Sequence, residues 1–349
     1  MPELPRVSVL VAARNEEANI ASCLAALAAF NYPAGRLEVL IGNDGSTDRT
    51  AGVVGDFIAD KPHFKLIEIV DSPISYAISL RYGVTNSTTK PNEKLNGKAN
   101  VLAQLADVAQ GDFLFITDAD VGVPPTWLIG MLAGFGPETG VVTGTTLVSG
   151  AGIWARLQAI DWLLAFGLIH LGTYLKLPLT GSGNNMALRR EAYYAVGGFR
   201  GIPFSVVEDY TLFQAIVARG YEHAHCLNPD VLAETQPAPT LATYLQQRKR
   251  WMTGAFSLPL PLLVGVLLQY LLVPILLVFS LLLPKTALLI YLVKWLVQSV
   301  IFAWTLYRTR QQHRWLDALL YEPYQLMFGT LSMIYYLLPI PIRWKGRTY

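Results

Sequence analysis

The pattern of apolar and polar positions divides the chain into two unlike parts. Up to about residue 250, short apolar runs alternate with mixed polar segments, as they do in a soluble α/β protein. Residues 255–340, in contrast, are almost free of charged side chains. We therefore predict a first domain over residues 1–255 and a membrane domain with two or three transmembrane helices over residues 256–349.

The first part predicts strands that alternate with helices. Strand patterns occupy residues 7–13, 37–42 and 64–69, and an Ala- and Leu-rich helix is predicted over residues 18–30. This alternation implies right-handed crossovers and a parallel sheet. No P-loop and no G-x-G-x-x-G sequence follows the first strand, so the pattern does not indicate a dinucleotide-binding fold.

A strongly apolar strand at residues 113–116 is followed by two carboxylates, Asp118 and Asp120. In open α/β sheets, ligands bind beyond the carboxyl ends of the strands. Two such carboxylates can hold a hard divalent cation whose shell is completed by phosphate oxygens and water. The alternative is an ordinary turn after a strand, because aspartate is a common turn residue.

Other polar segments stand at predicted strand ends and helix starts. After the first strand, Asn15 can cap the following helix, and the acidic residues beside it suit a first helical turn. The polar turn at residues 43–48 leads into another helix near Arg49. Lys98 begins a helix predicted to run to Ala109, where a positive charge is unfavourable unless it meets an anion such as phosphate. A solvated lysine is the alternative.

Three further segments contain residues that could bind a ligand or take part in catalysis. A glycine-rich loop at residues 181–187 precedes a helix predicted from Leu188, and glycines allow a ligand or a backbone to approach closely. Glu208 and Asp209 precede a helix predicted over residues 210–219. Four or five polar side chains and one indole gather at residues 246–251, just before the membrane domain.

The apolar, Trp-rich run at residues 151–177 contains Asp161 near its middle, which argues against a membrane span. An amphipathic helix in the membrane interface and a buried core helix both remain open. On the first alternative, this helix and the basic run at residues 248–250 would form a platform at the bilayer surface.

Apolar runs follow at residues 258–283, 286–307 and 316–338. The first two are long enough to cross a hydrocarbon core, which takes roughly 20 residues. Lys294 interrupts the second run, and Asp317 and Glu322 weaken the third. Basic clusters at residues 308–314 and 343–347 should both be cytoplasmic, although one span cannot have both of its ends on the same side. A third span and a re-entrant or interfacial segment therefore both remain open for residues 316–338.

Composition narrows the function classes. The chain of 349 residues is 52% hydrophobic and only 15% charged, against about 25% charged residues in soluble domains. Its net charge of +2 does not indicate a basic surface that binds nucleic acid. Cys23 and Cys226 suit a reducing compartment without a disulfide framework or a zinc site. The pattern predicts no signal peptide, because residues 5–13 lead straight into a strand.

Taken in order, these motifs resemble those of membrane-bound family 2 glycosyltransferases of the inverting type. The resemblance covers nearly all of residues 5–255. It implies a GT-A fold, which is a Rossmann-like α/β domain with a mostly parallel sheet, placed in the cytoplasm and followed by C-terminal transmembrane helices. The tail at residues 344–349 is also similar to the ceramide and hopanoid glucosyltransferase branch.

The resemblance implies roles for individual residues. The donor-binding residues would be Ala13, Asn15, Glu16, Asp44, Lys98 and Asp118. A divalent metal, Mg²⁺ or Mn²⁺, would be held by Asp118 and Asp120. Asp209 would be the catalytic base. The acceptor or product-phosphate site would contain Glu208, Gln247, Arg250 and Trp251.

The function implied is inverting transfer of a sugar from a UDP-sugar to a membrane-associated acceptor at the inner cell membrane, by a multi-pass protein. The expected partners are a nucleotide sugar, a lipid or glycan acceptor and the membrane, with no nucleic acid. We favour a lipid acceptor over a polysaccharide, because three short apolar runs make a thin channel for a polymer. A non-enzymatic scaffold with a degenerate domain is the other alternative, against which Asp118, Asp120 and Asp209 are all present.

Overall fold

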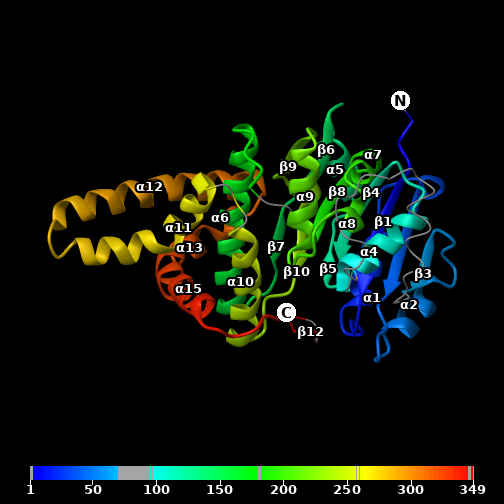
Figure 1. Cartoon of the computed structure of the whole chain (residues 1–349), viewed down its shortest axis with the longest axis horizontal. Helices are drawn as coiled ribbons and strands as arrows, with labels where there is room; N and C mark the ends of the chain where they lie inside the picture. The colour runs from blue at the N-terminus through cyan, green and yellow to red at the C-terminus, as the bar shows by residue number, and fades with distance from the viewer. Residues whose placement is uncertain are drawn as a thin grey trace. The chain divides into compact units, whose positions relative to one another are not determined.

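The computed structural model describes residues 3–69, 95, 97–179, 182–256, 258, 260–344 and 347–348. The chain forms two compact units (Figure 1). The first contains Met1–Thr146, Leu175–Cys226 and Asp230–Thr235, and the second contains Leu147–Tyr174, Leu227–Pro229 and Gln236–Tyr349. Residues 70–94, the start of the glycine-rich loop and part of the tail lie outside the described residues.

The first unit is built on a seven-stranded sheet in the order β3-β2-β1-β4-β8-β6-β9. Its strands are β1 (Val7–Ala13), β2 (Leu37–Asn43), β3 (Phe64–Glu68), β4 (Phe113–Asp118), β6 (Thr139–Gly144), β8 (Asn185–Arg189) and β9 (Glu222–Cys226). Only β8 runs antiparallel to its neighbours β4 and β6, so the predicted mostly parallel sheet is confirmed. A short β5 (Val121–Gly122) pairs with β10 (Ala233–Thr235), and the chain leaves the unit through β7 (Thr146–Val148).

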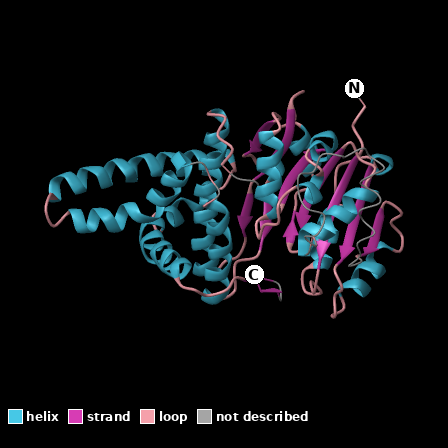
Figure 2. Cartoon of the chain, in the orientation of Figure 1, coloured by secondary structure: helices cyan, strands magenta, loops and turns pink. Residues whose placement is uncertain are grey.

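Helices cover both faces of this sheet (Figure 2). One face packs against α1 (Ile20–Ala28), α2 (Thr50–Ile58) and α5 (Trp127–Leu132). The other packs against α4 (Gly97–Val108), α7 (Arg190–Ala195), α8 (Gly198–Gly201) and α9 (Glu208–Ala218). The alternation of a strand explains both layers, because Val9 and Val11 of β1 enter the first core while Leu10 enters the second.

The prediction of a loop through residue 187 and a helix from Leu188 is wrong. In the structure, Asn185 to Arg189 form the strand β8, and α7 begins only at Arg190. Met186 and Leu188 are buried in one core and Ala187 in the other, which is the period-two pattern of a strand buried on both faces. The polar residue at the start of this strand concealed the pattern.

The second unit is mainly helical, with α6 (Ile153–Tyr174), α10 (Leu241–Ala255), α11 (Leu260–Phe279), α12 (Pro284–Arg308), α13 (Trp315–Ala318), α14 (Tyr321–Tyr324) and α15 (Thr330–Leu337). Short elements complete the chain: η1 (Ala34–Arg36), η3 (Pro229–Val231), η4 (Gln312–Arg314), the π-helix η5 (Gln325–Gly329), β11 (Arg343–Trp344) and β12 (Arg347–Thr348). A capping box at Thr240 and Thr243 begins α10, since each side chain accepts a hydrogen bond from the other residue's backbone N–H.

Helix α6 packs in the core of the second unit, which favours the core-helix alternative of the two that the sequence left open. Ile160 and Leu164 are only 1% and 2% exposed and pack in one cluster with Tyr244, Phe302 and Tyr321. The run is apolar around most of its circumference because the helix is enclosed by other helices.

The predicted basic platform at the bilayer surface is wrong for two of its three residues. Arg248 is buried and forms an ion pair with Asp161 of α6, so both charges are neutralised inside the unit. Lys249 is also buried, and its Nζ donates to the carbonyl oxygen of Leu338 at 2.6 Å. These side chains therefore connect helices of the protein instead of binding lipid headgroups.

Within the described residues, two helices are long and apolar enough to cross a membrane: Leu262–Phe279 of α11 and Pro284–Arg308, which is α12. The third apolar run is divided among α13, α14, η5 and α15. Its acidic residues are paired: Asp317 with Arg156, and Glu322 with Lys294 at 2.5 Å. Residues 321–337 are continuously helical, with the π-helix η5 between α14 and α15, and α13 precedes them as a separate short helix.

Asn185 allows a stability test of the first unit. Its side chain is fully buried, its Nδ2 donates to the carbonyl oxygens of Thr145 and Val231 at 2.9 Å each, and its Oδ1 accepts from the indole of Trp127 at 2.8 Å. Asn185→Ala removes all three hydrogen bonds and leaves the buried indole N–H of Trp127 without its acceptor, whereas the carbonyl oxygen of Thr145 still accepts from the N–H of Ala233. Since a buried group left unpaired costs about 1–3 kcal/mol, we expect the free energy of unfolding to fall by about 2 kcal/mol in urea titrations of the detergent-solubilised protein.

The matched control is Asn31→Ala, since Asn31 is exposed. This change should alter the free energy of unfolding by no more than about 0.5 kcal/mol. Equal stability of the two variants would contradict the structural role of Asn185.

Candidate active site

The candidate site lies where parallel strands of the first unit end. Strands β1, β2 and β4 are in parallel register, with Ala13 opposite Asn43 and Ala12 opposite Asp118. Their carboxyl ends therefore share one edge of the sheet, where α/β proteins bind ligands. The carbonyl oxygen of Ala13 accepts a hydrogen bond from the backbone N–H of Asp44 at 2.9 Å, which joins the first two loops at this edge.

Asn15 holds the loop after β1 against the loop after β2 through hydrogen bonds. The prediction that Asn15 caps α1 is wrong. Helix α1 begins only at Ile20. Asn15 has a φ of 54°, in the left-handed region that asparagine tolerates. Its Oδ1 accepts from the backbone N–H of Thr47 at 2.8 Å, and its own N–H donates to the hydroxyl of Ser46 at 3.1 Å.

Glu16 and Asp44 are held in the same pair of loops. The backbone N–H of Glu16 donates to the hydroxyl of Thr50 at 2.8 Å, and the side chain of Glu16 is buried. Arg14 Nη1 lies 3.1 Å from the carbonyl oxygen of Asp44 and 3.5 Å from its carboxylate. The sequence analysis gave Arg14 no role of its own, although its place directly after β1 was the available signal.

Lys98 joins the metal motif to the glycine-rich loop. Its Nζ lies 2.5 Å from Asp118 Oδ1 and donates to the carbonyl oxygen of Gly183 at 3.2 Å. Burial lowers the pKa of Lys98, but the charges of Asp118, Glu208 and Asp209 outweigh it and hold that pKa above its ordinary value. Lys98 is thus an ammonium ion at neutral pH, and it is suited to an anion such as phosphate.

Glu208 and Asp209 occupy the first turn of α9, where the helix dipole favours negative charge. The Oδ2 of Asp209 accepts from the backbone N–H of Gly183 at 2.7 Å, and its Oδ1 accepts from the N–H of Tyr210 at 2.8 Å. The structure therefore brings Lys98, Asp118 and Asp209 together around the peptide of Gly183.

Asp118 and Asp120 fit a divalent cation that a donor would complete. Both carboxylates are partly exposed, and Mg²⁺ is commonly held by one or two carboxylates together with substrate phosphates. Among the described residues, no group of three or more His, Cys, Asp and Glu side chains is arranged to hold an ion alone. Burial and then the charges of Asp120, Asp118 and Glu16 raise the pKa of the Cys23 thiol well above its ordinary value.

The remaining predicted residues lie on α10 in the second unit. Gln247, Arg250 and Trp251 are each partly exposed there. The guanidinium of Arg248 lies 4.9 Å from the centre of the Trp251 ring, and Trp162 contacts that ring edge-on at 5.3 Å. Arg248 and Trp162 therefore orient the indole, a role that the sequence analysis did not assign to them.

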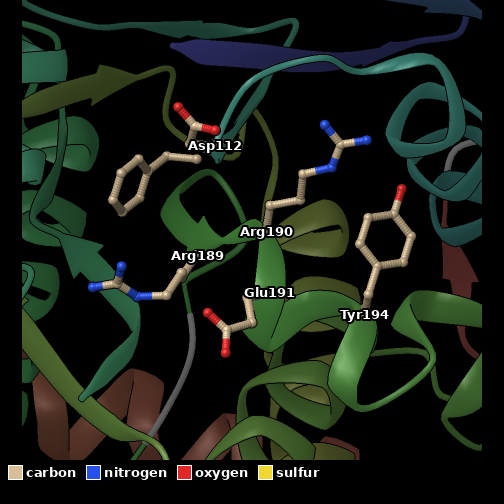
Figure 3. A pocket seen from close by; sticks show the side chains of 6 residues that line it. Asp112, Arg189, Arg190, Glu191 and Tyr194 are labelled. Carbon is tan, nitrogen blue, oxygen red and sulfur yellow. The ribbon is translucent and has the colours of Figure 1, made fainter. Parts of the chain in front are cut away.

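A pocket with a volume of about 520 Å³ lies elsewhere in the first unit, and Figure 3 shows the side chains that line it. Its lining residues are Asp112, Phe113, Arg189, Arg190, Glu191 and Tyr194. It lies at the amino end of β4, whereas Asp118 ends that strand. Arg189 donates to the carbonyl oxygen of Gly136 at 2.8 Å and covers the ring of Phe113, so it has a packing role. The cavity is therefore distinct from the candidate site.

Matches to protein-family models show which family the chain belongs to. The model described as glycosyl transferase family 21 matches residues 81–349. The chain belongs to this family. The model of glycosyl transferase family 2 matches residues 8–90. Both matches are to glycosyltransferase families, as the resemblance in the motifs predicted.

Curated relatives include a probable glycosyltransferase, YdaM, of Bacillus subtilis, which is 27% identical over 73% of this chain and 56% of its own length. A beta-monoglucosyldiacylglycerol synthase of Synechocystis is 27% identical over 72% of this chain and 48% of its own. A poly-beta-1,6-N-acetyl-D-glucosamine synthase of Staphylococcus epidermidis is 25% identical, over 71% and 54%. The chain spans about half the length of the curated relatives it matches.

Among solved structures, a mannosyltransferase from Pyrobaculum calidifontis in complex with GDP-Man and Mn²⁺ is similar, with a TM-score of 0.57 and 20% identity. The match covers 91% of this chain and 87% of the other. At this identity the likeness establishes the GT-A fold, which confirms the predicted fold class. The roles given to individual site residues stay predictions.

The Lys98–Asp118 ion pair predicts how the glycosyltransferase binds metal. In the donor-free protein the ammonium of Lys98 competes with a cation for the carboxylate of Asp118. Lys98→Met should therefore strengthen Mn²⁺ binding by at least about tenfold, given the size of close charge interactions near a surface. Asp118→Asn and Asp120→Asn should weaken it. Electron paramagnetic resonance of free Mn²⁺ measures all three changes without a turnover assay.

Lys61→Met is the matched control, because Lys61 also lies 2.5 Å from an aspartate, Asp60, and neither belongs to the candidate site. It should leave Mn²⁺ binding unchanged. If Lys98→Met bound Mn²⁺ no better than Lys61→Met, Asp118 would not be a ligand for which Lys98 competes.

Proposed function

We propose that this glycosyltransferase moves a sugar from a nucleotide sugar, for which we expect UDP as the nucleotide, to a lipid acceptor at the membrane with inversion at the anomeric carbon. The observation that carries the proposal is the grouping of Lys98, Asp118 and Asp209 around Gly183 at the carboxyl edge of the sheet. In this proposal the ammonium of Lys98 would serve the leaving group and the carboxylate of Asp209 would serve the nucleophile, and their closeness supports a shared site.

The donor half of the reaction needs positive charge. As the bond to the sugar breaks, the diphosphate gains negative charge, and the ammonium of Lys98 is pre-organised to stabilise it. A Mg²⁺ or Mn²⁺ ion held by Asp118 and Asp120 would supply Lewis-acid stabilisation of the same oxygens. Asp44, oriented by Arg14, would contact the base of the nucleotide.

The acceptor half needs a proton acceptor. The attacking hydroxyl loses its proton as it approaches the anomeric carbon from the face opposite the diphosphate, which inverts the configuration. Asp209 would take this proton, a contribution of about 10²–10⁴-fold in rate. Gln247, Arg250 and Trp251 are proposed for the acceptor or product-phosphate site, with Glu208 beside the base.

A lipid acceptor is favoured over a polysaccharide. A synthase that extrudes a polymer needs a protein-lined channel, and two membrane-crossing helices in the described part of the chain make a thin one. The similar proteins include a synthase named for a glucosyldiacylglycerol and another named for poly-N-acetylglucosamine, so both acceptor classes occur among relatives.

We further propose that α11 and α12 cross the inner membrane as a hairpin, with the catalytic unit in the cytoplasm. Arg308 is the last residue of α12, Arg310 and Arg314 follow it, and such basic residues remain cytoplasmic. A cysteine placed at exposed Gln312 should then react with a membrane-impermeant maleimide in inside-out vesicles and not in intact cells. Labelling from the outside would contradict this orientation.

Asp209→Asn tests the catalytic assignment. The amide is nearly isosteric but cannot accept the proton, so kcat should fall by about 10²–10⁴-fold while the affinity for the nucleotide sugar stays within about twofold. Calorimetric titration with the donor and a radiolabel transfer assay measure the two quantities.

Asp56→Asn is the control, because Asp56 is exposed on α2. It should change neither donor affinity nor turnover. Full turnover by Asp209→Asn would remove Asp209 as the base, and complete inactivity of the unmodified protein across donors and metals would favour the scaffold alternative.

The acceptor class is tested with a panel of radiolabelled nucleotide sugars and a total lipid extract. We expect label in the organic phase, and mass spectrometry of that product identifies the sugar and the lipid. Label found only in a long water-soluble polymer would overturn the lipid acceptor and support the polysaccharide alternative.

A further inference from the structure

We infer that Gly183 is a positioning residue that orients the carboxylate of Asp209 and connects it to Lys98. The inference rests on the proposed function, in which Asp209 is the base. It assigns a defined task to the glycine-rich loop, for which the sequence suggested only a close approach of a ligand or a backbone.

The peptide N–H of Gly183 fixes one oxygen of the base. It donates to Asp209 Oδ2 at 2.7 Å, while the N–H of Tyr210 donates to Oδ1 at 2.8 Å. With one donor on each oxygen, the carboxylate has a single favourable rotation about its χ2 torsion. Each oxygen still keeps a second lone pair, which is what an incoming acceptor hydroxyl needs.

The carbonyl oxygen of the same residue faces the donor half of the site. It accepts from Lys98 Nζ at 3.2 Å, and this Nζ also lies 2.5 Å from Asp118 Oδ1. Asp118, Lys98, Gly183 and Asp209 thus form one continuous chain of polar contacts. A donor phosphate that engages Lys98 acts at one end of this chain, and the base is at the other.

Glycine is required at position 183 because Asp209 lies too close to leave room for a Cβ atom. The backbone conformation at this position does not itself require glycine. A Cβ atom on Gly183 would lie 2.5 Å from Asp209 Cβ and 2.6 Å from its Oδ2, which is nearer than real Cβ contacts. The φ of Gly183 lies outside the left-handed region, so alanine could adopt the same backbone. Asp209 Cβ is attached directly to α9, so the loop and the carboxylate must separate to admit a methyl group.

Gly183→Ala should therefore displace the base without removing it. We expect kcat for transfer to fall by about 10²-fold, which is the effect of a misplacement of about 1 Å. Donor affinity should stay within about twofold, because Lys98 and Asp118 remain. In the Asp209→Asn background the same change should have no further effect on residual turnover, because the two residues act as one unit.

Two glycines provide matched controls. Gly52→Ala, on α2, adds a methyl group with nothing within 4 Å and should be neutral. Gly144→Ala places a Cβ 2.3 Å from Asn185 Oδ1, so it disturbs the core of the same unit without touching Asp209. Gly144→Ala should lower the midpoint temperature of thermal unfolding. For the fraction of this variant that remains folded, kcat should fall less than it does in Gly183→Ala.

Hydrogen exchange tests the inference without relying on the folding of Gly183→Ala. The amide of Gly183 should exchange faster in Asp209→Ala than in the unmodified protein, whereas Asp56→Ala should leave it unchanged. Unchanged exchange in Asp209→Ala, or full kcat in Gly183→Ala, would overturn the inference. Full turnover by Asp209→Asn would instead overturn the proposed base, so the two failures are distinguishable.

Discussion

The candidate site depends on the charge of Lys98 and on the carboxylates that surround it. Asp118, Glu208 and Asp209 approach one another from β4 and from the start of α9, and their mutual repulsion would oppose this arrangement without a cation between them. Lys98 is only 26% exposed, so its charge is screened less than that of a surface lysine. The same charge that stabilises the folded edge is therefore available to a diphosphate when a donor enters.

The sheet supplies the geometry for this charge cluster. Because β1, β2 and β4 run in parallel register, the loops after them meet at one edge, and hydrogen bonds of Asn15 and Arg14 fasten the first loop to the second. The antiparallel strand β8 enters beside β4 and carries the loop of Gly183 to that edge. The antiparallel strand β8 therefore positions the peptide of Gly183, which forms hydrogen bonds with both Lys98 and Asp209.

An element could be predicted from the sequence only where a local residue pattern encodes it. The run before Asp118 is continuous and apolar, so both the buried strand and the edge at which its carboxylates stand were predictable. Strand β8 was not, because Asn185 and the preceding glycines suggest a loop, and the hydrogen bonds that satisfy Asn185 come from distant segments. The contact between Gly183 and Asp209 likewise joins positions 26 residues apart, which no local pattern encodes.

The second unit shows why apolar composition alone could not decide between the two alternatives for α6. An apolar run is equally compatible with lipid contact and with enclosure by other helices, and only the partner of its charged residue separates the two. Asp161 pairs with Arg248, which makes α6 and α10 neighbours inside one unit. The same logic applies to the third apolar run, since Glu322 contacts Lys294 of α12 and Asp317 contacts Arg156 of α6. For the buried pair of Asp161 and Arg248, removing one partner leaves an uncompensated charge, at a cost of about 3–5 kcal/mol. The three pairs join α6 to α10, α12 to α14 and α6 to α13, so they specify which helices pack together in a unit whose helices are mainly apolar.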